Sequence, residues 1–404
     1  LGLSGSMPGM SDGMLPDDLD SLLAGLVASG GIELSAQGAD PAASTLSGRL
    51  ALAAAAGVVS VETAEPFELT VPIDRIAADP DLSAVLGDHL SDLREVFGPA
   101  VTLGFGTERD EFGITFETAA DARTVTLSGP MMLSGTGEDG ATLGAEITVA
   151  VDPGADGGPR LIGPVSITVT GDRISAGGVT LSDLRATVQG TQQGDAFTGS
   201  YLVELSGDAP PNGVRGTALK LAGALHLDPD LITVDVADGG SIAARRLELG
   251  RSLRPVESLV ATLPKRETPP LLKWVRDPEA PGGSRTGLEM HLRPGPFRLD
   301  ARADGQGSAV DVDAGRLIVT ADLDGTGTGK ARLRLSNGAV GLIGQGINAR
   351  GLAADLRLVL TEGAARLASL TVAAERLVDE STEITRFVPM SLQADARPAP
   401  ARGA

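Results

Sequence analysis

The sequence Arg316-Leu-Ile-Val-Thr-Ala-Asp-Leu-Asp324 continues through the turn Gly325-Thr-Gly-Thr-Gly329 into Lys330-Ala-Arg-Leu-Arg-Leu335. Apolar and polar residues alternate through both runs, and the larger apolar ones include Leu317, Val319, Leu333 and Leu335. A third run repeats the pattern with Leu356, Leu358 and Leu360. Period two places alternate side chains on opposite faces of a strand. We therefore expect antiparallel strands with one apolar and one polar face, joined by short Gly-rich turns.

The same alternation recurs along most of the chain. It predicts strands near 31–37, 46–55, 57–63 and 66–72, and almost nothing but strands from Val101 onward. The clearest examples carry Leu143, Ile147 and Val149, then Leu161, Val165 and Ile167, then Leu219, Leu221 and Leu225. About 25 short strands with Gly- or Asp-containing turns are expected, a spacing typical of all-β meanders. The predicted fold class is mainly β: an elongated, twisted, groove-forming antiparallel sheet of U-shaped section with two short helices.

Two stretches predict helices, and one predicts an interruption of the sheet. Residues 16–27 begin with Pro and acidic residues, and residues 80–97 place an apolar stripe before Gly98-Pro99. Residues 263–283 hold five prolines and a basic group around Trp274, namely Lys265, Arg266, Lys273 and Arg276. That many prolines predict a loop outside the central ladders. The expected organisation is a flexible start (1–15), a first β-groove region (16–262), the basic insert (263–283), a second β-groove region (284–394) and a flexible tail (395–404).

Composition narrows the functional classes. The chain has 404 residues and a formal net charge of −20, which argues against nucleic acid as a partner because such binding neutralises phosphates. It has no Cys, and aromatic residues make up only 2%. A core without large aromatic fillers suggests a smooth aliphatic surface. No run reaches the ~18–20 apolar residues of a membrane span, and no signal-peptide pattern is present. We interpret the chain as a segment of something longer or as a processed product.

Residue types that often carry catalysis or bind metals do not occur here in a spacing typical of an active site or a metal site. His89, His226 and His291 are far apart, and none has a metal-ligand spacing. His89 falls in the predicted helix and His226 on a polar strand face, so solvated roles are expected. Asp322-Leu-Asp324-Gly lacks the remaining ligands of a calcium loop and is interpreted as a hairpin turn. We expect no enzyme activity, no cofactor and no metal site.

The predicted apolar faces need a cover. A helix is ~10 Å wide and strands lie ~4.8 Å apart, so two helices cover only about four or five strands. Open sheets rarely exceed ~10 strands without curling or splitting. The sheet is therefore expected to close into sandwiches or barrels, to stack as a β-helix, or to form a trough filled by hydrocarbon.

Several strand sequences resemble AsmA-like bacterial envelope proteins, in particular the YdbH and TamB branch of repeating β-groove proteins. The resemblance rests on Ile347-Asn-Ala-Arg-Gly-Leu-Ala-Ala-Asp-Leu-Arg-Leu358, on Gly48-Arg-Leu-Ala-Leu-Ala-Ala-Ala-Ala-Gly57 and on 325–335, and its character runs through most of 31–394. It implies a U-sectioned sheet that conducts phospholipid chains between bacterial membranes. It also implies a periplasmic location, an inner-membrane anchor and a small outer-membrane lipoprotein partner. We expect this stretch of sequence to depart from the family pattern at two points, because no segment in it resembles the family's anchor or its terminal domain.

The resulting prediction is an intermembrane phospholipid conduit of the Gram-negative envelope. The alternative is a secreted β-helix or β-sandwich structural protein, adhesin-like and without lipid transport. The residues expected to line the groove are Leu143, Ile147, Val149, Leu161, Val165, Ile167, Leu219, Leu221, Leu225, Leu317, Val319, Leu333, Leu335, Leu356, Leu358 and Leu360.

Overall fold

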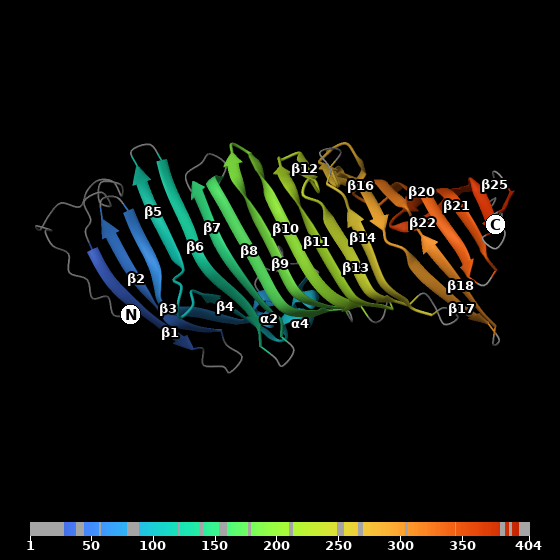
Figure 1. The fold of residues 1–404 in the computed structure, drawn as a ribbon. Helices are drawn as coiled ribbons and strands as arrows, with labels where there is room; N and C mark the ends of the chain where they lie inside the picture. The colour runs from blue at the N-terminus through green and yellow to red at the C-terminus, as the bar shows by residue number, and fades with distance from the viewer. Residues whose placement is uncertain are drawn as a thin grey trace, which may run out of the picture. The chain divides into compact units, whose positions relative to one another are not determined.

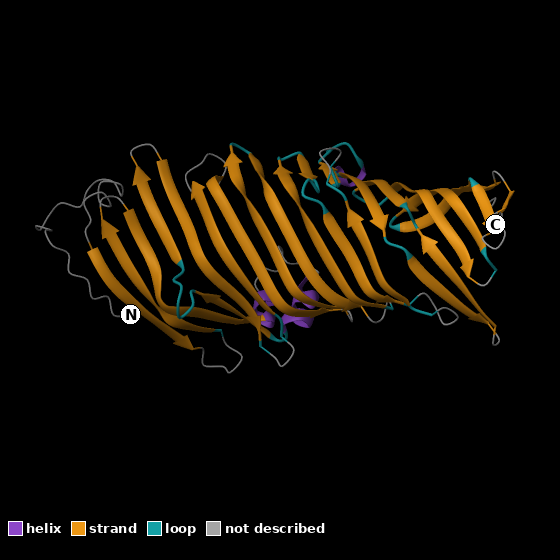
Figure 2. Ribbon diagram, viewed as in Figure 1, coloured by secondary structure: helices purple, strands orange, loops and turns teal. Residues whose placement is uncertain are grey.

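A computed structural model of the chain divides into two compact units, Leu1–Gly194 (unit 1) and Asp195–Ala404 (unit 2). The stretch 263–283 lies inside unit 2. Figure 1 shows the elements and Figure 2 shows how strongly strands dominate both units. The structure describes residues 28–37, 44–55, 58–78, 89–119, 122–136, 140–152, 160–176, 179–209, 213–248, 254–265, 270–303, 306–343, 345–379, 384–387 and 390–395. The predicted helix at 16–27 and the predicted flexible start 1–15 lie outside these residues. The predicted flexible tail 395–404 also lies outside them, apart from Asp395, which is the last residue of a strand.

Unit 1 is an antiparallel sheet built mostly from consecutive strands. Its strands are β1 (Ala28–Gln37), β2 (Thr45–Ala55), β3 (Val58–Pro72), β4 (Ala100–Phe105), β5 (Gly113–Ala119), β6 (Ala122–Gly135), β7 (Thr142–Asp152), β8 (Arg160–Ala176) and β9 (Val179–Gln193). Strand β3 pairs with β5 through its first half and with β4 through its second half, and β6 pairs with both from the other side. Two short strands placed end to end thus fill one position between two long ones.

Two short helices accompany this sheet. They are α2 (Ile73–Ala78) and α4 (His89–Phe97), and they lie behind the lower ends of the long strands in Figures 1 and 2. The prediction at 80–97 is confirmed for α4, whereas residues 79–88 lie outside the described residues. Helix α2 was not expected, because Ile73–Ala78 is too short for a helical period to stand out. An Arg94–Asp74 ion pair joins the two helices.

Unit 2 repeats the same construction. Its elements are β10 (Ala196–Ala209), β11 (Val214–Leu227), β12 (Leu231–Val234), β13 (Gly240–Leu247), β14 (Val256–Leu263), β15 (Leu272–Val275), the 3-10 turn η2 (Pro281–Gly283), β16 (Arg285–Pro294), β17 (Phe297–Ala303), β18 (Gln306–Asp313), β19 (Arg316–Asp324), β20 (Gly329–Ile343), β21 (Ile347–Thr361), β22 (Ala364–Ala374), β23 (Arg376–Asp379), β24 (Ile384–Phe387) and β25 (Met390–Asp395). Strands β12 and β13 share the edge of β11, and β14 and β15 share the edge of β16. Likewise β18 and β19 both pair with one edge of β20, and β22 and β23 both pair with one edge of β21.

The prediction that 263–283 stays outside the ladders is wrong for its middle. Residues Leu272–Val275 form β15, which pairs with β12 on one side and β16 on the other. Trp274 is opposite Ile232 and Thr286 in these two ladders. The prolines at 264, 269, 270, 278 and 281 all flank these four residues, so no ladder loses an N–H donor to them. The prediction counted the prolines over all 21 residues and therefore missed a strand of only four residues.

Several strands are longer than the pattern suggested, because bulges carry them past breaks in the alternation. In unit 2 the registers β10–β11, β11–β13 and β13–β14 are all interrupted at one level, at Asp208, Gly216, Arg245 and Ser258. Gly216 and Ser258 have φ of 58° and 60° there. A Cβ on Gly216 would lie 2.7 Å from the Arg245 Cβ, so this position requires glycine. Only the β10–β11 interruption is a register shift, because Val214–Thr217 of β11 spans one residue more than Gly207–Ala209 of β10. Such a bulge bends its strand and increases the local twist.

The predicted class, a mainly β antiparallel sheet with two short helices, is confirmed. Every strand pairing within the described parts of the two units is antiparallel, which rules out the parallel β-helix there.

Candidate functional site: the apolar sheet face

Strand registers in unit 1 collect the predicted lining residues on one face, which we call the apolar face. Ile147 of β7 is opposite Ile167 of β8, and Val149 is opposite Val165. The row continues beyond these strands, since Leu127 of β6 also faces Val149 and Val188 of β9 faces Ile167. Antiparallel partners point to the same side, so all six predicted residues of unit 1 share this face.

Unit 2 forms its own apolar face by the same rule. Leu219 and Leu221 of β11 are opposite Leu205 and Val203 of β10. Strands β16 and β19 to β21 continue this face through two rows, Leu292–Leu317–Leu335–Ala354 and Met290–Val319–Leu333–Leu356. Leu358 and Leu360 follow opposite Ala331 and Gly329. The ten predicted lining residues of unit 2 therefore all lie on one face.

Charge is absent from the central part of these faces. The positions in register with Ile147 and Val149 on β6, β7 and β8 carry no Asp, Glu, Lys or Arg, and the same holds for the two rows named above on β16 and β19–β21. A carboxylate or ammonium on this side would have to be desolvated if hydrocarbon covered the face, so an uncharged lining suits an apolar partner.

The residues that the structure describes outside the strands cover only part of these faces. In unit 1 Ile73, Val96 and Phe97 from the helical segment pack on Val101, Leu133, Leu143 and Ile174. In unit 2 Val236 and Leu271, from the segments flanking β12 and β15, pack on Leu221, Ile242 and Leu288. Of the sixteen predicted lining residues, Leu143 and Leu221 thus contact apolar clusters of the chain itself. The other fourteen belong to neither cluster.

The exposure of the lining agrees with a single sheet layer. Fourteen of the sixteen residues are half-buried, while Val165 is buried and Leu161 is 39% exposed. Lateral packing between neighbouring strands produces this intermediate state. Only twelve hydrophobic residues of the described chain are fully buried, which is few for an apolar content of 42%. A second sheet packed ~10 Å away would have buried these rows, as in a sandwich.

Sequence reasoning missed two aromatic residues of unit 2. Tyr201 of β10 is on the apolar face, in the alternation of Val203 and Leu205, and its hydroxyl donates a 2.6 Å hydrogen bond to the Asp235 carbonyl. Burial, with a contribution from the Asp235 charge, raises the pKa of Tyr201 to about 12. Trp274 joins the same face in register with Leu227 and Ile232. Alternation within 197–205 would have found Tyr201, whereas four residues of β15 are too few to show a period.

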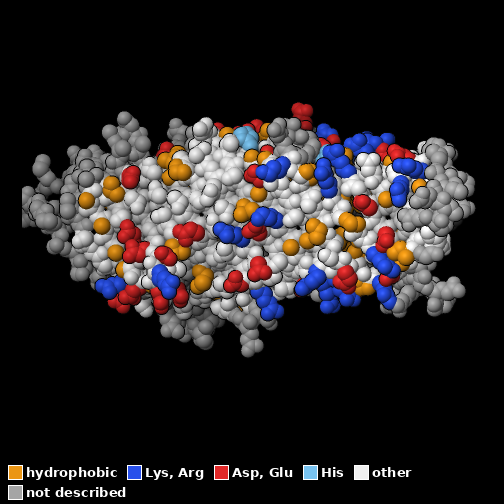
Figure 3. Space-filling model, viewed as in Figure 1, with side chains coloured by type: hydrophobic (Ala, Val, Ile, Leu, Met, Phe, Trp, Pro, Cys, Tyr) orange, Lys and Arg blue, Asp and Glu red, His pale blue; other side chains and the backbone are white. Residues whose placement is uncertain are grey.

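The opposite, polar face differs between the units. In unit 1 it presents rows of hydroxyls, such as Thr168 and Thr187, whose Oγ1 atoms are 3.2 Å apart. In unit 2 it carries ion pairs, including Arg285 with both oxygens of Asp322 at 2.8 Å. Figure 3 shows a view in which charged side chains are spread widely, with hydrophobic ones scattered between them.

The three histidines have different surroundings within their own units. His89 begins α4. His226 contacts Thr198 Oγ1 at 3.0 Å and Asp228 Oδ2 at 2.7 Å, on the polar face. His291 contacts Glu289 Oε1 at 2.6 Å and Arg316 Nη2 at 2.7 Å. No group of three potential metal ligands converges within the described residues.

The turn at Asp324 is the hairpin that the sequence predicted. Asp324 Oδ1 accepts hydrogen bonds from the backbone N–H of Thr326 at 2.9 Å and of Thr328 at 3.0 Å, and β19 pairs with β20 on either side. The hydrogen bond from the Thr326 hydroxyl is the main cause that lowers the pKa of Asp324. The carboxylate is therefore occupied in shaping the turn.

Comparison with family models, with curated proteins and with solved structures finds no match to this chain. None of the helices that the structure describes is both long and apolar enough to cross a membrane.

Proposed function

We propose that this protein carries phospholipid acyl chains on the apolar faces of its sheets, as a conduit between the membranes of a Gram-negative envelope. The observation that supports the proposal most directly is the uncharged, half-buried lining, which exceeds what α2, α4 and the loops of unit 2 cover. The resemblance of 347–358 to AsmA-like proteins supports the periplasmic location, attachment to the inner membrane through a segment outside this chain, and a small outer-membrane lipoprotein as partner.

The dimensions of the strands suit a lipid chain. Strand β8 has 17 residues, and β20 and β21 have 15 each, which corresponds to roughly 50–55 Å at ~3.3 Å per residue. One leaflet of a bilayer contributes roughly half of its ~30 Å hydrocarbon core. Each methylene that leaves water for the apolar face contributes about 0.8 kcal/mol, so two acyl chains offset much of the cost of extraction from a bilayer.

Movement along the face needs no covalent step. Rows of Leu, Val and Ile repeat at each strand, so neighbouring positions offer nearly equal free energies to a methylene chain. The bulge between β10 and β11 at Gly216 bends β11 and increases its twist, which supports a concave rather than a flat lining. The headgroup stays in water while the chains slide from strand to strand.

The first experiment asks whether the purified 404-residue chain retains phospholipid. Lipid extraction followed by mass spectrometry is expected to recover phospholipid in a fixed molar ratio to protein, and the lipid is expected to exchange with vesicles. Purified chain that is folded, free of lipid and unable to bind a dye sensitive to apolar surfaces would refute the proposal. That outcome would favour the structural, adhesin-like alternative.

A further inference from the structure

The polar face of β19–β22 gathers positive charge in a chain that is strongly acidic. Residues 1–194 hold only 8 of the 33 basic residues, so 25 lie in unit 2. Between the Asp324 turn and the bulge at Gly338, the registers place six cationic side chains on this one face of four strands, namely Arg316, Lys330, Arg332, Arg334, Arg357 and Arg366. Three carboxylates share the face, namely Asp322, Asp324 and Asp355. We call this group the cationic patch.

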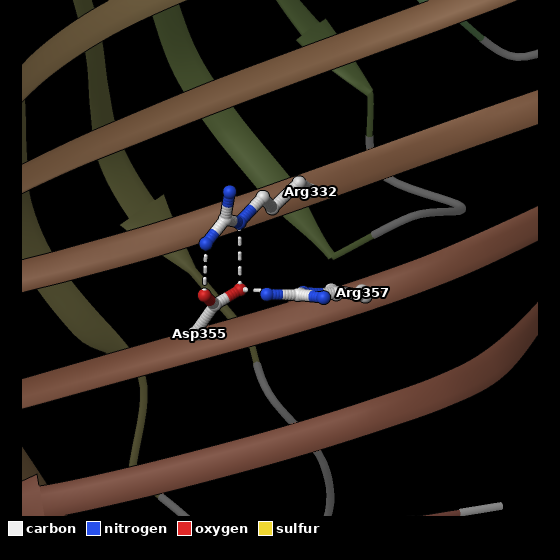
Figure 4. Close-up of polar contacts among 3 residues, drawn as sticks. All are labelled: Arg332, Asp355 and Arg357. Carbon is white, nitrogen blue, oxygen red and sulfur yellow. Dashed lines mark hydrogen bonds and ion pairs between the residues drawn. The ribbon is translucent and has the colours of Figure 1, made fainter.

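The three carboxylates are already engaged. Asp322 holds Arg285 through two hydrogen bonds, and Asp324 accepts the hydrogen bonds that close its own turn. Asp355 interacts with two guanidinium groups, those of Arg332 and Arg357, as Figure 4 shows. Its Oδ1 accepts a 2.8 Å hydrogen bond from Arg332 Nε and lies 3.6 Å from Arg357 Nε, while its Oδ2 binds Arg332 Nη2.

The register makes this arrangement unusual. Arg332 and Arg357 are directly opposite each other on β20 and β21, where like charges destabilise a strand pair. One carboxylate between two guanidinium groups leaves an excess of positive charge. The Arg357 side chain remains 58% exposed, so most of its donors stay open to water or to a ligand.

A pocket of about 540 Å³ opens over the same residues. Its polar lining comes from Lys330, Arg332, Arg357, Thr320 and Asp322. The rest of the lining is apolar and comes from Ala321, Ala331, Leu358, Val359 and Ala368. Thr320 is opposite Arg332 in the β19–β20 register, which adds a hydroxyl donor to the basic side chains. Guanidinium groups bind phosphate oxygens through paired N–H donors, and an ammonium group adds a compact charge.

We propose that the cationic patch binds a phosphate group in this pocket, held by Arg357, Lys330 and the outward N–H groups of Arg332. Asp355 fixes the Arg332 guanidinium and offsets the repulsion between the two arginines when no anion is bound. The phosphate belongs either to a soluble phosphate ester or to the headgroups of an anionic membrane surface. The site lies on the polar face and is independent of the proposed lipid path.

The test measures binding of inorganic phosphate to the full chain by calorimetry, with sodium chloride at equal ionic strength as reference. Arg357→Gln is expected to weaken phosphate binding at least tenfold, because it removes one of three cations and leaves the Arg332–Asp355 pair intact. Asp355→Asn is expected to strengthen binding several-fold by removing the competing charge. Arg246→Gln is the matched control, since Arg246 is a half-exposed strand arginine paired with Glu248 and Glu257 outside the pocket.

Two further probes identify the source of the phosphate. Flotation with phosphatidylcholine vesicles that contain or lack phosphatidylglycerol tests the membrane surface, and glycerol 3-phosphate tests a soluble ester. Loss of flotation in Arg357→Gln assigns the site to headgroups, and binding of the ester alone assigns it to soluble ligands; both support the site. No preference for phosphate over chloride, equal loss in Arg246→Gln, or vesicle binding without phosphate binding would each overturn it. Circular dichroism confirms that every variant is folded.

Discussion

A single carboxylate placed on the apolar face distinguishes between two hypotheses, a face that carries lipid and a closed hydrophobic core. Ile147 is well suited to the test because it is opposite Gly129 on one side and Ile167 on the other, and it belongs to neither apolar cluster. In lipid-free protein an Asp at this position stays hydrated. We expect Ile147→Asp to lower the free energy of unfolding by only about 1–2 kcal/mol, from lost lateral contacts and weaker strand propensity.

Lipid transfer should respond far more strongly. A carboxylate facing hydrocarbon costs about 2.5–3.5 kcal/mol at a membrane midplane, which corresponds to roughly a hundredfold slower passage. On the proposed function each unit contributes its own apolar face to the lipid path, so Leu219→Asp in unit 2 should slow transfer as much as Ile147→Asp in unit 1. The neighbouring residues on the polar face supply matched controls, and both Thr148→Asp and Ala218→Asp are expected to leave transfer within a factor of two.

The measurements are thermal melting and transfer of labelled phospholipid between donor and acceptor liposomes, made on the same preparations. An unpaired carboxylate in a closed core would instead cost about 3–5 kcal/mol and unfold the protein. If both face variants lose their cooperative melt before they lose transfer, the reasoning from an uncovered face is wrong.

Three further predictions test the architecture. Gly216→Ala should lower the free energy of unfolding by about 1–3 kcal/mol, because φ of 58° and the adjacent Arg245 Cβ exclude a side chain. The control is Gly194→Ala, in a turn where no atom lies within 4 Å of the added Cβ. Chemical denaturation should show a smaller loss of unfolding free energy for this control than for Gly216→Ala. Replacing 263–283 with a Gly-Ser linker should lower the melting temperature markedly, since β15 pairs on both edges; a melt unchanged by the replacement would contradict the ladder seen at 272–275. Tyr201 is the only tyrosine, so an absorbance titration should show one transition near pH 12 in the folded chain and near pH ~10 in urea. Because its folded pKa is raised, the neutral form stabilises the fold fully below pH ~10, and this contribution is lost as the pH rises toward 12; a folded-state midpoint near 10 would place the ring in water.

The sequence alone determined the class of fold and the sidedness of the strands. Alternation at period two depends only on neighbouring residues, so Leu317, Val319, Leu333 and Leu335 could be assigned to one face before any pairing was known. The turn at Asp324 was predictable for the same reason, because its carboxylate hydrogen-bonds to residues only two and four positions away. The uncharged character of the central rows followed from the same local pattern.

Tertiary structure decided which strands pair with one another and which side chains these pairings bring together. Strand β15 is four residues long, and only its two partners, β12 and β16, make it a strand. The level at which Asp208, Gly216, Arg245 and Ser258 align depends on the registers of four strands, which loop lengths and bulges set together. Arg332, Asp355 and Arg357 are up to 25 positions apart, and the β20–β21 register alone brings one carboxylate between two guanidinium groups. Cross-strand pairing is a long-range choice between many similar Leu-, Ala- and Arg-rich segments, so no single segment contains the information that selects its partner.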